Sequence, residues 1–366
     1  MKKIFFYISE ISLPSKTASP IQIFKMCDAF SSMNYSVSLF TFNNKLSPKI
    51  LKKNYNIKKK INILNYKKNK VEINFFYRIL FSIFVVKYLK KKNNLVIYGR
   101  SLLTSIFLSF LKIQNFVEIH QEPKGFTLIL FNLKKLIFGT KYQKFIFIHK
   151  NLIPYFSVGK NDYIVKDDAV SLDDFKTQRK AKIKDECLYT GGLYPGKGLE
   201  IISKIAFKNP KVKFTVYGDR LKANHDVISG VPKNVFIKGF IPYNKIPKVL
   251  KQFKIILMPY SEKIMINAKN SDVSNYISPL KLFEYLASGN IIIASKIPAY
   301  AHILKNNFNA FLVDKNNIDE WSQKINFALK EKIIIKKIKK NALLTAKRFT
   351  WNKRAREIIK FINKNG

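Results

Sequence analysis

The alternation of short apolar runs with helix-like runs constrains this fold more than any other feature of the sequence. Residues 3–8 are apolar, a polar loop 9–18 follows, and a helical pattern over 20–33 leads to an apolar run at 35–42. Strand, helix and strand in this order are typical of a βαβ unit with parallel strands. The first loop contains no glycine, so a GxGxxG dinucleotide site is not supported.

The same alternation begins again at residue 186 and continues to a basic C-terminal helix. Because 366 residues exceed one ordinary domain, the sequence predicts an α/β protein with two parallel-sheet domains that face each other across a cleft. The segment VSLDDF, residues 170–175, has the turn-like polar character expected at the crossover between them.

One histidine is a candidate site residue in the first half. In NFVEIHQEP, residues 115–123, apolar residues alternate with Glu118 and His120. This pattern places His120 at the carboxyl end of a strand, where open α/β sheets bind their ligands. A lone histidine there can equally be structural, and Glu118 on the same strand face can serve either role. The other histidines have no spacing that suggests a metal site.

Residues 278–298 predict a helix followed by a buried strand. Ser278 is a good N-cap, Pro279 suits the first turn, and Gly289 ends the helix. One side of the helix would carry Lys281, Glu284, Tyr285 and Ser288, and the other Leu282, Phe283 and Leu286. The free N–H groups of the first turn could bind a nucleotide diphosphate, with a carboxylate one turn deeper for its ribose. An ordinary amphipathic helix has the same pattern, so both interpretations stay open.

A glycine-rich turn over residues 191–198 follows a strand and opens a helix. Its glycines allow close approach of a phosphate, and Lys197 supplies a cation. The spacing is not that of a Walker A loop, and a plain αβ turn is an equal alternative. Residues 261–277 are polar and irregular, which predicts a mobile loop over a site.

The net charge of +44 requires an anionic partner or context. Nucleic acid is one candidate, but the chain has no RNP-like strand, zinc-finger spacing or heptads after a basic region. An anionic membrane surface is therefore favoured. The apolar helix predicted over 73–90, with the basic run that follows it, is short for a membrane span and indicates a core or interfacial helix.

Cysteine usage and the N-terminus indicate a cytoplasmic protein. Cys27 and Cys187 lie far apart without CxxC or metal-type spacing, as in a reducing compartment. The basic and apolar start ends at Glu10, before a long signal-peptide core. We expect a protein bound peripherally to the inner face of the cell membrane.

Several motifs together resemble a known family. In order and spacing, GGLYPGKGLE, VYGD, NVFIKGFIPYNKIPKVLK, ILMPYS and SPLKLFEYLASGNIIIAS are similar to the carboxyl domain of retaining GT-B glycosyltransferases of family 4. The amino half adds SPIQIFKMCDAFSSMNYSVSLFTF, FVEIHQEP and VSLDDF, a looser match. The resemblance implies Rossmann-like domains over residues 1–170 (acceptor side) and 171–345 (nucleotide-sugar side). Residues 346–366 would form a helix packing back on the first domain.

The resemblance also implies roles for individual residues. Lys197 would bind the donor diphosphate, and Glu284 would hydrogen-bond the ribose. His120 would lie near the transferred sugar, and Ser19 near the diphosphate or acceptor. As catalytic residues we therefore expect His120, Lys197 and Glu284. The remaining donor-binding candidates are Gly192, Gly218, Ser278, Pro279, Leu280 and Lys281. Neither a metal nor another cofactor is expected.

Three departures from the family pattern bear on these roles. The family has an acidic residue eight positions before the one that matches Glu284, and this chain has Tyr276 there. The identity of the donor sugar therefore stays open. The phosphate-binding arginine of the glycine turn is replaced by Gly192, so Lys197 would neutralise more of the diphosphate, with Lys281 as a helper. The first loop also lacks the family's common Gly-Gly pair.

Together these features predict a retaining glycosyltransferase that moves a sugar from a nucleotide-diphosphate donor to a polysaccharide or glycolipid precursor at the cytoplasmic membrane face, as in lipopolysaccharide or capsule synthesis. The sequence shows no buried nucleophile, so front-side transfer through an oxocarbenium-like state is expected, with the diphosphate helping to deprotonate the acceptor. A basic nucleic-acid-binding protein and a GT-B protein that binds donor without catalysis are the alternatives.

Overall fold

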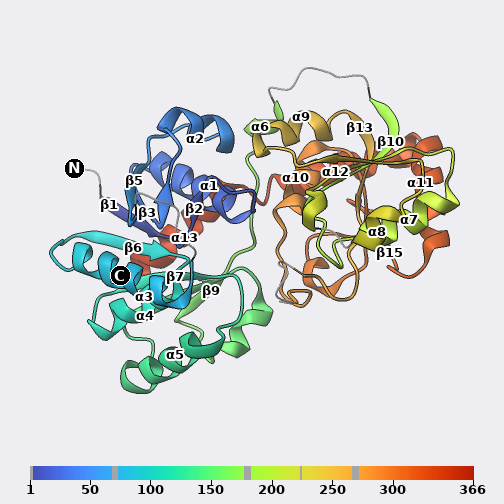
Figure 1. Ribbon diagram of the computed structural model, residues 1–366. Helices are drawn as coiled ribbons and strands as arrows, with labels where there is room; N and C mark the ends of the chain where they lie inside the picture. The colour runs from blue at the N-terminus through green and yellow to red at the C-terminus, as the bar shows by residue number, and fades with distance from the viewer. Residues whose placement is uncertain (1–2, 68–72, 177–182, 223–224, 266–271) are drawn as a thin grey trace. The chain divides into compact units, whose positions relative to one another are not determined.

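A computed structural model describes residues 3–67, 73–176, 183–222, 225–265 and 272–366. The chain divides into two compact units, which are taken separately below (Figure 1). Unit 1 comprises Met1–Asp168 and Trp351–Gly366, and unit 2 comprises Ala169–Thr350. Part of the loop predicted over 261–277 lies outside the described residues.

Unit 1 contains a parallel sheet with helices packed on it. The strand order is β5 (Asn62–Asn65), β3 (Ser36–Thr41), β1 (Ile4–Ile8), β6 (Leu95–Gly99), β7 (Asn115–Ile119), β8 (Gln143–Phe147) and β9 (Tyr163–Val165). Every pairing in this sheet is parallel. The helices are α1 (Ser19–Ser32), α2 (Pro48–Tyr55), α3 (Phe75–Leu89), α4 (Leu102–Phe110), α5 (Gly125–Phe138), the 3-10 turn η1 (Lys150–Tyr155) and α13 (Trp351–Asn365). Two short strands, β2 (Ser12–Leu13) and β4 (Asn43–Asn44), pair separately.

The C-terminal helix α13 belongs to unit 1, although the chain reaches it from unit 2. It packs along α1, and in Figure 1 the red helix lies among the blue elements of unit 1. Arg354, Ala355 and Ile358 are buried on its inner face. The predicted return of the C-terminal helix to the first domain is confirmed.

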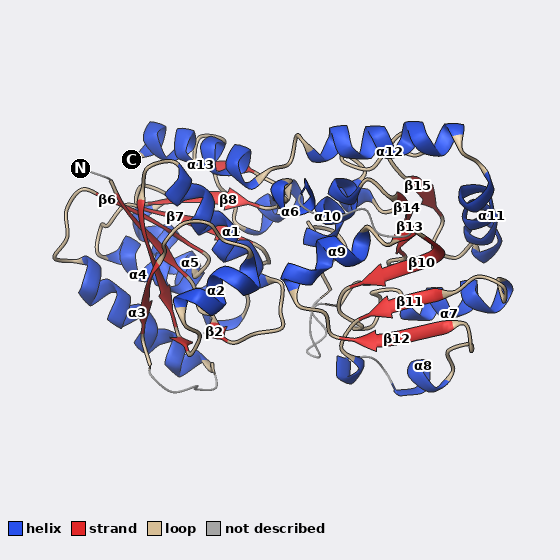
Figure 2. Cartoon of the chain, turned by 90° about the horizontal axis from the view of Figure 1, so that it is seen from above, coloured by secondary structure: helices blue, strands red, loops and turns tan. Residues whose placement is uncertain are grey.

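Unit 2 is a second parallel α/β unit. Its strand order is β12 (Val235–Gly239), β11 (Phe214–Tyr217), β10 (Lys184–Thr190), β13 (Phe253–Met258), β14 (Ile291–Ser295) and β15 (Phe311–Val313), all parallel (Figure 2). The helices are α6 (Asp173–Lys176), α7 (Leu199–Lys208), α8 (His225–Ser229), α9 (Ile246–Leu250), α10 (Leu280–Ser288), α11 (Ile318–Lys330) and α12 (Ile333–Ala346), with 3-10 turns η2 (Arg220–Lys222), η3 (Tyr243–Lys245) and η4 (Pro298–Tyr300).

Two parallel α/β units are thus confirmed, and the near-continuous apolar strands reflect sheets covered by helices. The cleft expected between the units stays a prediction. Helix α3 serves the core of unit 1, where Phe81, Val85 and Leu89 are buried against the sheet. No helix in the described part of the chain is long and apolar enough to cross a membrane.

Helix α2 begins after Ser47, whose side chain accepts a hydrogen bond from the Ile50 N–H. Two other helix starts differ by one residue from those that the sequence indicates. Helix α1 already includes Ser19, and its N-cap is Ala18 without a side-chain cap bond. Helix α10 begins at Leu280 with Pro279 as N-cap, so Ser278 lies one residue before the cap.

Candidate functional site

The site region of unit 2 lies where the strand order of its sheet reverses. From the central strand β10 the chain passes to β11 on one side, whereas β13 lies on the other side. The crevice at the carboxyl ends of two such strands is the usual ligand site of an open α/β sheet. Here these ends are followed by the glycine-rich turn after Thr190 and by Pro259 and Tyr260 after β13.

The glycine-rich turn packs too closely for side chains at several positions. Gly196 has φ +77°, and a Cβ there would lie 1.8 Å from the Lys263 carbonyl oxygen. Gly198, the N-cap of α7, has φ +111°, and a Cβ would lie 2.3 Å from the Pro259 carbonyl oxygen. Both positions therefore require glycine, because a side chain would meet rigid backbone. The turn is thus held firmly against the segment that follows β13.

Two lysine ammonium groups meet beside this turn. Lys197 Nζ lies 5.3 Å from the centroid of the Tyr260 ring, and Lys281 Nζ lies 4.8 Å from the same centroid. Lys281 Nζ is also 4.0 Å from the centre of the Tyr189 ring. Lysine positioned over aromatic faces gains a cation–π attraction. A turn residue and a helix residue far apart in sequence therefore converge on the ring of Tyr260.

Lys281 is held in an unusual state for a lysine. Its Nζ is buried and has no hydrogen-bond partner within the described residues. Burial and the nearby Lys197 charge hold the pKa of Lys281 well below its ordinary value, while Glu284 opposes that shift. Burial lowers the pKa of Lys197 to about 8. A buried ammonium without a partner is costly, and an incoming anion would remove that cost.

The glycines of the predicted site lie against the same turn. A Cβ on Gly191 would come within 2.8 Å of Lys281 Nζ, so this ammonium touches the turn backbone. The Tyr189 hydroxyl donates to the Gly192 carbonyl oxygen at 2.9 Å. Gly218, at the end of β11, packs so closely that a Cβ would lie 2.6 Å from the Gly191 carbonyl oxygen. The structure thus brings Gly192, Gly218, Lys197 and Lys281 together.

Helix α10 contributes the remaining predicted donor residues. Ser278 is 8% exposed just before the helix, and Pro279 and Leu280 are half-buried at its start. Glu284, one turn further on, is 6% exposed. Burial raises the pKa of the nearby Tyr243, and the charges of Asp174 and Glu284 raise it further. An ordinary amphipathic helix was one interpretation of this stretch, but residues 282–288 are all buried, Tyr285 and Ser288 included. The reason is that α10 packs against both α12 and α9.

In unit 1, His120 follows β7 and belongs to a buried network centred on Glu118. His120 Nε2 lies 2.6 Å from Glu118 Oε1. Arg354 of α13 donates to both carboxylate oxygens of Glu118, at 2.9 and 3.1 Å. Gln22 donates to Glu118 at 2.7 Å, and Tyr98 donates as well. Glu118 therefore has a structural role, and its carboxylate orients the imidazole of His120.

The protonation state of His120 follows from this network. Burial and the Arg100 charge lower the pKa of His120 to about 4, against the opposing influence of Glu118. Arg354 and hydrogen bonds outweigh burial and hold the pKa of Glu118 far below its usual range. At neutral pH the neutral imidazole donates a hydrogen bond from Nε2 to the carboxylate. The lone pair of Nδ1 can then accept a hydrogen bond from another group. Ser19 is half-buried at the start of α1, also in unit 1.

The sequence did not indicate the tyrosines or Arg354 as site residues. Tyr189 lies within an apolar strand and Tyr260 just after one, so both resembled ordinary core aromatics. Their positions next to the carboxyl ends of the two central strands were the available signal. Arg354 lies 236 positions from Glu118, and no local pattern connects the two.

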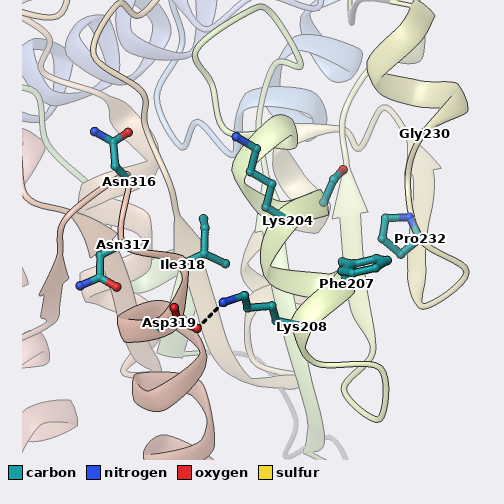
Figure 3. A pocket seen from close by; sticks show the side chains of 10 residues that line it. Lys204, Phe207, Lys208, Gly230, Pro232, Asn316, Asn317, Ile318 and Asp319 are labelled. Atoms are coloured by element: carbon teal, nitrogen blue, oxygen red, sulfur yellow. Dashed lines mark hydrogen bonds and ion pairs between the residues drawn. The ribbon is translucent and has the colours of Figure 1, made fainter.

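An open pocket of about 580 Å³ lies elsewhere in unit 2 (Figure 3). Its lining includes Lys204, Phe207 and Lys208 of α7 and residues 316–319 at the start of α11. Lys208 pairs with Asp319 across it. None of the predicted site residues lines this pocket. Among the described residues, no group of three or more His, Cys, Asp and Glu side chains is arranged to hold a metal.

Comparison with known proteins finds one family model that matches residues 171–345 and solved structures that share the fold of the chain. Residues 171–345 match the family model of glycosyl transferases group 1. A glycosyltransferase from Rickettsia africae superposes with a TM-score of 0.76 at 13% identity, covering 100% of this chain and 98% of that one. HepE from Anabaena in complex with UDP and glucose superposes with a TM-score of 0.72 at 15% identity, covering 99% and 100%.

A further similar structure is WaaG, a glycosyltransferase involved in lipopolysaccharide biosynthesis, with a TM-score of 0.65, 12% identity and coverage of 97% and 98%. A search of curated protein sequences gives no match. At these identities the structural likeness shows the fold, which is GT-B. The family match over unit 2, together with this fold, supports a glycosyltransferase.

Proposed function

We propose that the chain is a retaining glycosyltransferase of family 4 that transfers a sugar from a nucleotide-diphosphate donor. The acceptor would be a polysaccharide or glycolipid precursor at the cytoplasmic face of the membrane, as in lipopolysaccharide or capsule synthesis. The observation that carries the proposal is the meeting of Lys197 and Lys281 over Tyr260, beside the glycine-rich turn. A diphosphate is the ligand that this pair of buried cations fits best.

The donor would bind within unit 2. Lys197 and Lys281 would neutralise the diphosphate, whose oxygens need charge-assisted donors. Gly192 and Gly218 would present backbone rather than side chain to the donor, as glycines do at phosphate sites. The backbone N–H groups in the first turn of α10, which begins at Leu280, would add to the helix dipole in favouring an anion. Glu284 would accept hydrogen bonds from the ribose hydroxyls. HepE was solved with UDP-glucose, which supports a nucleotide-sugar donor.

The chemistry requires a sugar to separate from its diphosphate leaving group. Negative charge grows on the leaving oxygen, and two fixed ammonium groups stabilise that charge more in the transition state than in the ground state. Because no metal is expected in this family, the lysines would supply the whole cationic contribution. We propose front-side attack through an oxocarbenium-like state, in which the departing diphosphate accepts the acceptor proton.

The acceptor would be bound by unit 1, near His120 and Ser19. The neutral imidazole of His120 is oriented by Glu118 and presents Nδ1 as an acceptor. It could therefore accept a hydrogen bond from a sugar hydroxyl. WaaG, a similar structure, is involved in lipopolysaccharide biosynthesis, which supports this class of acceptor. Peripheral binding to an anionic membrane surface follows from the charge of +44.

A thermal-shift screen of nucleotide sugars tests donor binding. A donor at about 100 times its Kd should stabilise the protein by about 2.7 kcal/mol. The Lys197→Ala variant should lower kcat/KM by about 10²–10³, the scale of a lost oxyanion donor. Lys204→Ala removes an exposed lysine of α7 and is the matched control, with kcat/KM expected near that of the wild type. Unchanged activity in the Lys197→Ala variant would refute the role.

A donor-binding protein without catalysis is the second candidate. It is favoured by Tyr276, which is buried at the position where the family has an acidic residue. Its hydroxyl donates to the Asp272 carbonyl oxygen at 3.4 Å. Such a protein would give a thermal shift with nucleotide sugars but neither transfer nor slow hydrolysis. Release of nucleoside diphosphate from any stabilising donor excludes this candidate.

A further inference from the structure

Helix α5 exposes a continuous apolar stripe to solvent. Its large apolar side chains are exposed by 46–85%, and they are Phe126, Ile129, Leu133, Leu136 and Ile137. The spacing i, i+3, i+7, i+10 and i+11 places them on one helical face. Scattered exposed leucines are ordinary in soluble proteins, but five on one face form a patch.

The opposite face of α5 is firmly packed, so the stripe is not the sign of a loose helix. Phe131 is 1% exposed and contacts the rings of Phe145 and Phe156. Lys135 Nζ donates to the Phe156 carbonyl oxygen at 3.1 Å, which fixes the helix to the segment after η1. In Figure 1, α5 lies at the lower edge of unit 1, outside the sheet.

Aromatic side chains lie at the first end of the stripe, and another exposed one lies at the end of η1. Phe126 contacts the ring of Phe75 at the start of α3, and the adjacent Phe76 is 62% exposed. Tyr155, at the end of η1, is 45% exposed. Aromatic residues of this kind prefer the interface between lipid headgroups and water.

The charged side chains around the stripe are mostly lysines. Residues 123–161 contain seven lysines and no aspartate or glutamate. At the two ends of this span, Lys124 pairs with Glu122 and Lys144 pairs with Asp162. Lys124, Lys141 and Lys150 are exposed. An apolar helix face bordered by lysines has the chemistry of an interfacial helix, whose apolar side enters the acyl boundary while the cations meet anionic lipid.

We propose that this α5 face docks unit 1 on the surface of an anionic lipid bilayer. The inference rests on the proposed function at a membrane face and assigns that binding to α5. Helix α3, for which the sequence left a core role and an interfacial role open, buries its apolar side chains in the core. A second copy of the chain is a poorer occupant, because a two-fold interface would bring the same lysines against one another. A bilayer of opposite charge complements them.

Flotation of the full chain with vesicles tests the proposal. The Ile129→Glu/Leu136→Glu variant places two carboxylates in the stripe. Its Kd for vesicles containing anionic lipid should be at least about tenfold higher than that of the wild type. The control, Phe207→Glu/Leu221→Glu, makes the same charge change in unit 2, at residues 80% and 88% exposed. It should bind within about twofold of the wild type, and neutral vesicles should bind neither protein.

A tryptophan at position 136 reports insertion directly. The native Trp321 and Trp351 are 0% and 4% exposed, so their emission is already that of buried indole. Leu136→Trp should add emission that shifts to the blue and is quenched by brominated lipid when anionic vesicles are present. Phe207→Trp, in unit 2, should show neither change. If the emission of the tryptophan at position 136 is neither shifted nor quenched when anionic vesicles are added, the proposal is overturned.

The remaining outcomes separate this proposal from the proposed function. If the Ile129→Glu/Leu136→Glu variant binds vesicles like the wild type, the α5 assignment fails, whatever the activity. If it turns a wild-type dimer into a monomer without changing vesicle binding, the face covers a second copy instead. Thermal shifts with nucleotide sugars should be equal in wild type and variant, which also shows that the variant is folded. If nucleotide sugars shift the melting temperature of neither protein, that result counts against the proposed donor site and not against the α5 assignment.

Discussion

Lys281 and Arg354 show two ways in which this chain treats a buried cation. The guanidinium of Arg354 is 3% exposed and forms a bidentate ion pair with Glu118, whose side chain is 0% exposed. The ammonium of Lys281 is buried against Tyr189 and Tyr260 without a hydrogen-bond partner in the described part of unit 2. The cation of Arg354 is compensated within the fold, whereas that of Lys281 is not. An anion at the proposed donor site would supply the missing partner.

Replacing Lys281 should therefore improve stability while it damages binding. Lys281→Met removes a desolvated amine but keeps the length of the side chain. We expect the unliganded protein to be equally stable or more stable by about 1 kcal/mol, as at other functional sites built at a cost to stability. The Kd for nucleoside diphosphate should rise about tenfold or more. Urea denaturation and isothermal titration measure the two effects, and a variant less stable than wild type with unchanged Kd would contradict the prediction.

The imidazole of His120 should make stability depend on pH. Its pKa is lowered from 6.5 to about 4 in the folded chain, so on acidification the unfolded chain binds a proton first. Stability from this group is complete above about pH 6.5 and falls by about 3 kcal/mol as pH drops to about 4. Asp168, with its pKa raised to about 7 by burial, acts in the opposite direction.

A comparison of wild type with His120→Gln isolates the histidine, because Asp168 is common to both. The free energy of unfolding of the wild type minus that of the variant should decrease from about pH 6.5 to about pH 4.5. Urea denaturation at several pH values measures this difference. A difference that does not vary with pH would mean that His120 is not held neutral by its surroundings.

Helix α13 is the element whose position depends most on one interaction. It reaches unit 1 at the end of the chain and packs along α1. Arg354 also donates to the backbone carbonyls of Asp167 and Lys166, so one side chain joins α13, β7 and the segment after β9. Because β7 also leads to His120, the same interaction sets the orientation of a predicted catalytic residue.

Removal of Arg354 should be among the most damaging single changes in unit 1. Arg354→Met leaves the Glu118 carboxylate buried without its partner and should cost about 3–5 kcal/mol. Adding Glu118→Gln should recover part of this loss, since the uncompensated charge disappears. Arg356→Met, at an exposed position of the same helix, should change stability by less than about 0.5 kcal/mol. Equal effects of Arg354→Met and Arg356→Met would rule out the proposed anchoring.

At the scale of the whole molecule, the net charge of +44 acts differently from the two lysines of the site. Most of the basic side chains are exposed, where salt screens them over a distance of about 10 Å. The ammonium groups of the site are buried or half-buried between tyrosines, where screening is weaker. Attraction of polyanions in general and recognition of a diphosphate should therefore respond differently to salt.

Salt dependence separates a glycosyltransferase from a nucleic-acid-binding protein. The Kd for single-stranded RNA should rise about a hundredfold or more between about 50 and 200 mM salt, as expected for many phosphate contacts. The Kd for nucleoside diphosphate should change by less than about fivefold, because few and enclosed charges are involved. RNA that remains tightly bound at the higher salt and displaces nucleoside diphosphate would support the nucleic-acid alternative.

The architecture and part of the site could be predicted from the sequence because both depend on local patterns. Strand and helix periodicities are properties of consecutive residues, and they correctly indicated two parallel α/β units. A glycine-rich turn after a strand and a lysine in a helix's first turn are also local, so Lys197 and Lys281 could be named as candidates from the sequence. The helix starts at Ser19 and Ser278 were misplaced by one residue, since capping depends on dihedral angles that composition does not specify.

What the sequence by itself determined is where strands and helices lie and which residue types follow each strand. Only the tertiary structure decided which of these residues meet: Lys281 with Lys197 over Tyr260, and Glu118 with Arg354. It also decided that apolar α3 is covered while apolar α5 keeps one face open, although both sequences are similarly hydrophobic. The physical reason is that burial depends on what packs against a helix from distant parts of the chain, and no pattern within the helix encodes it.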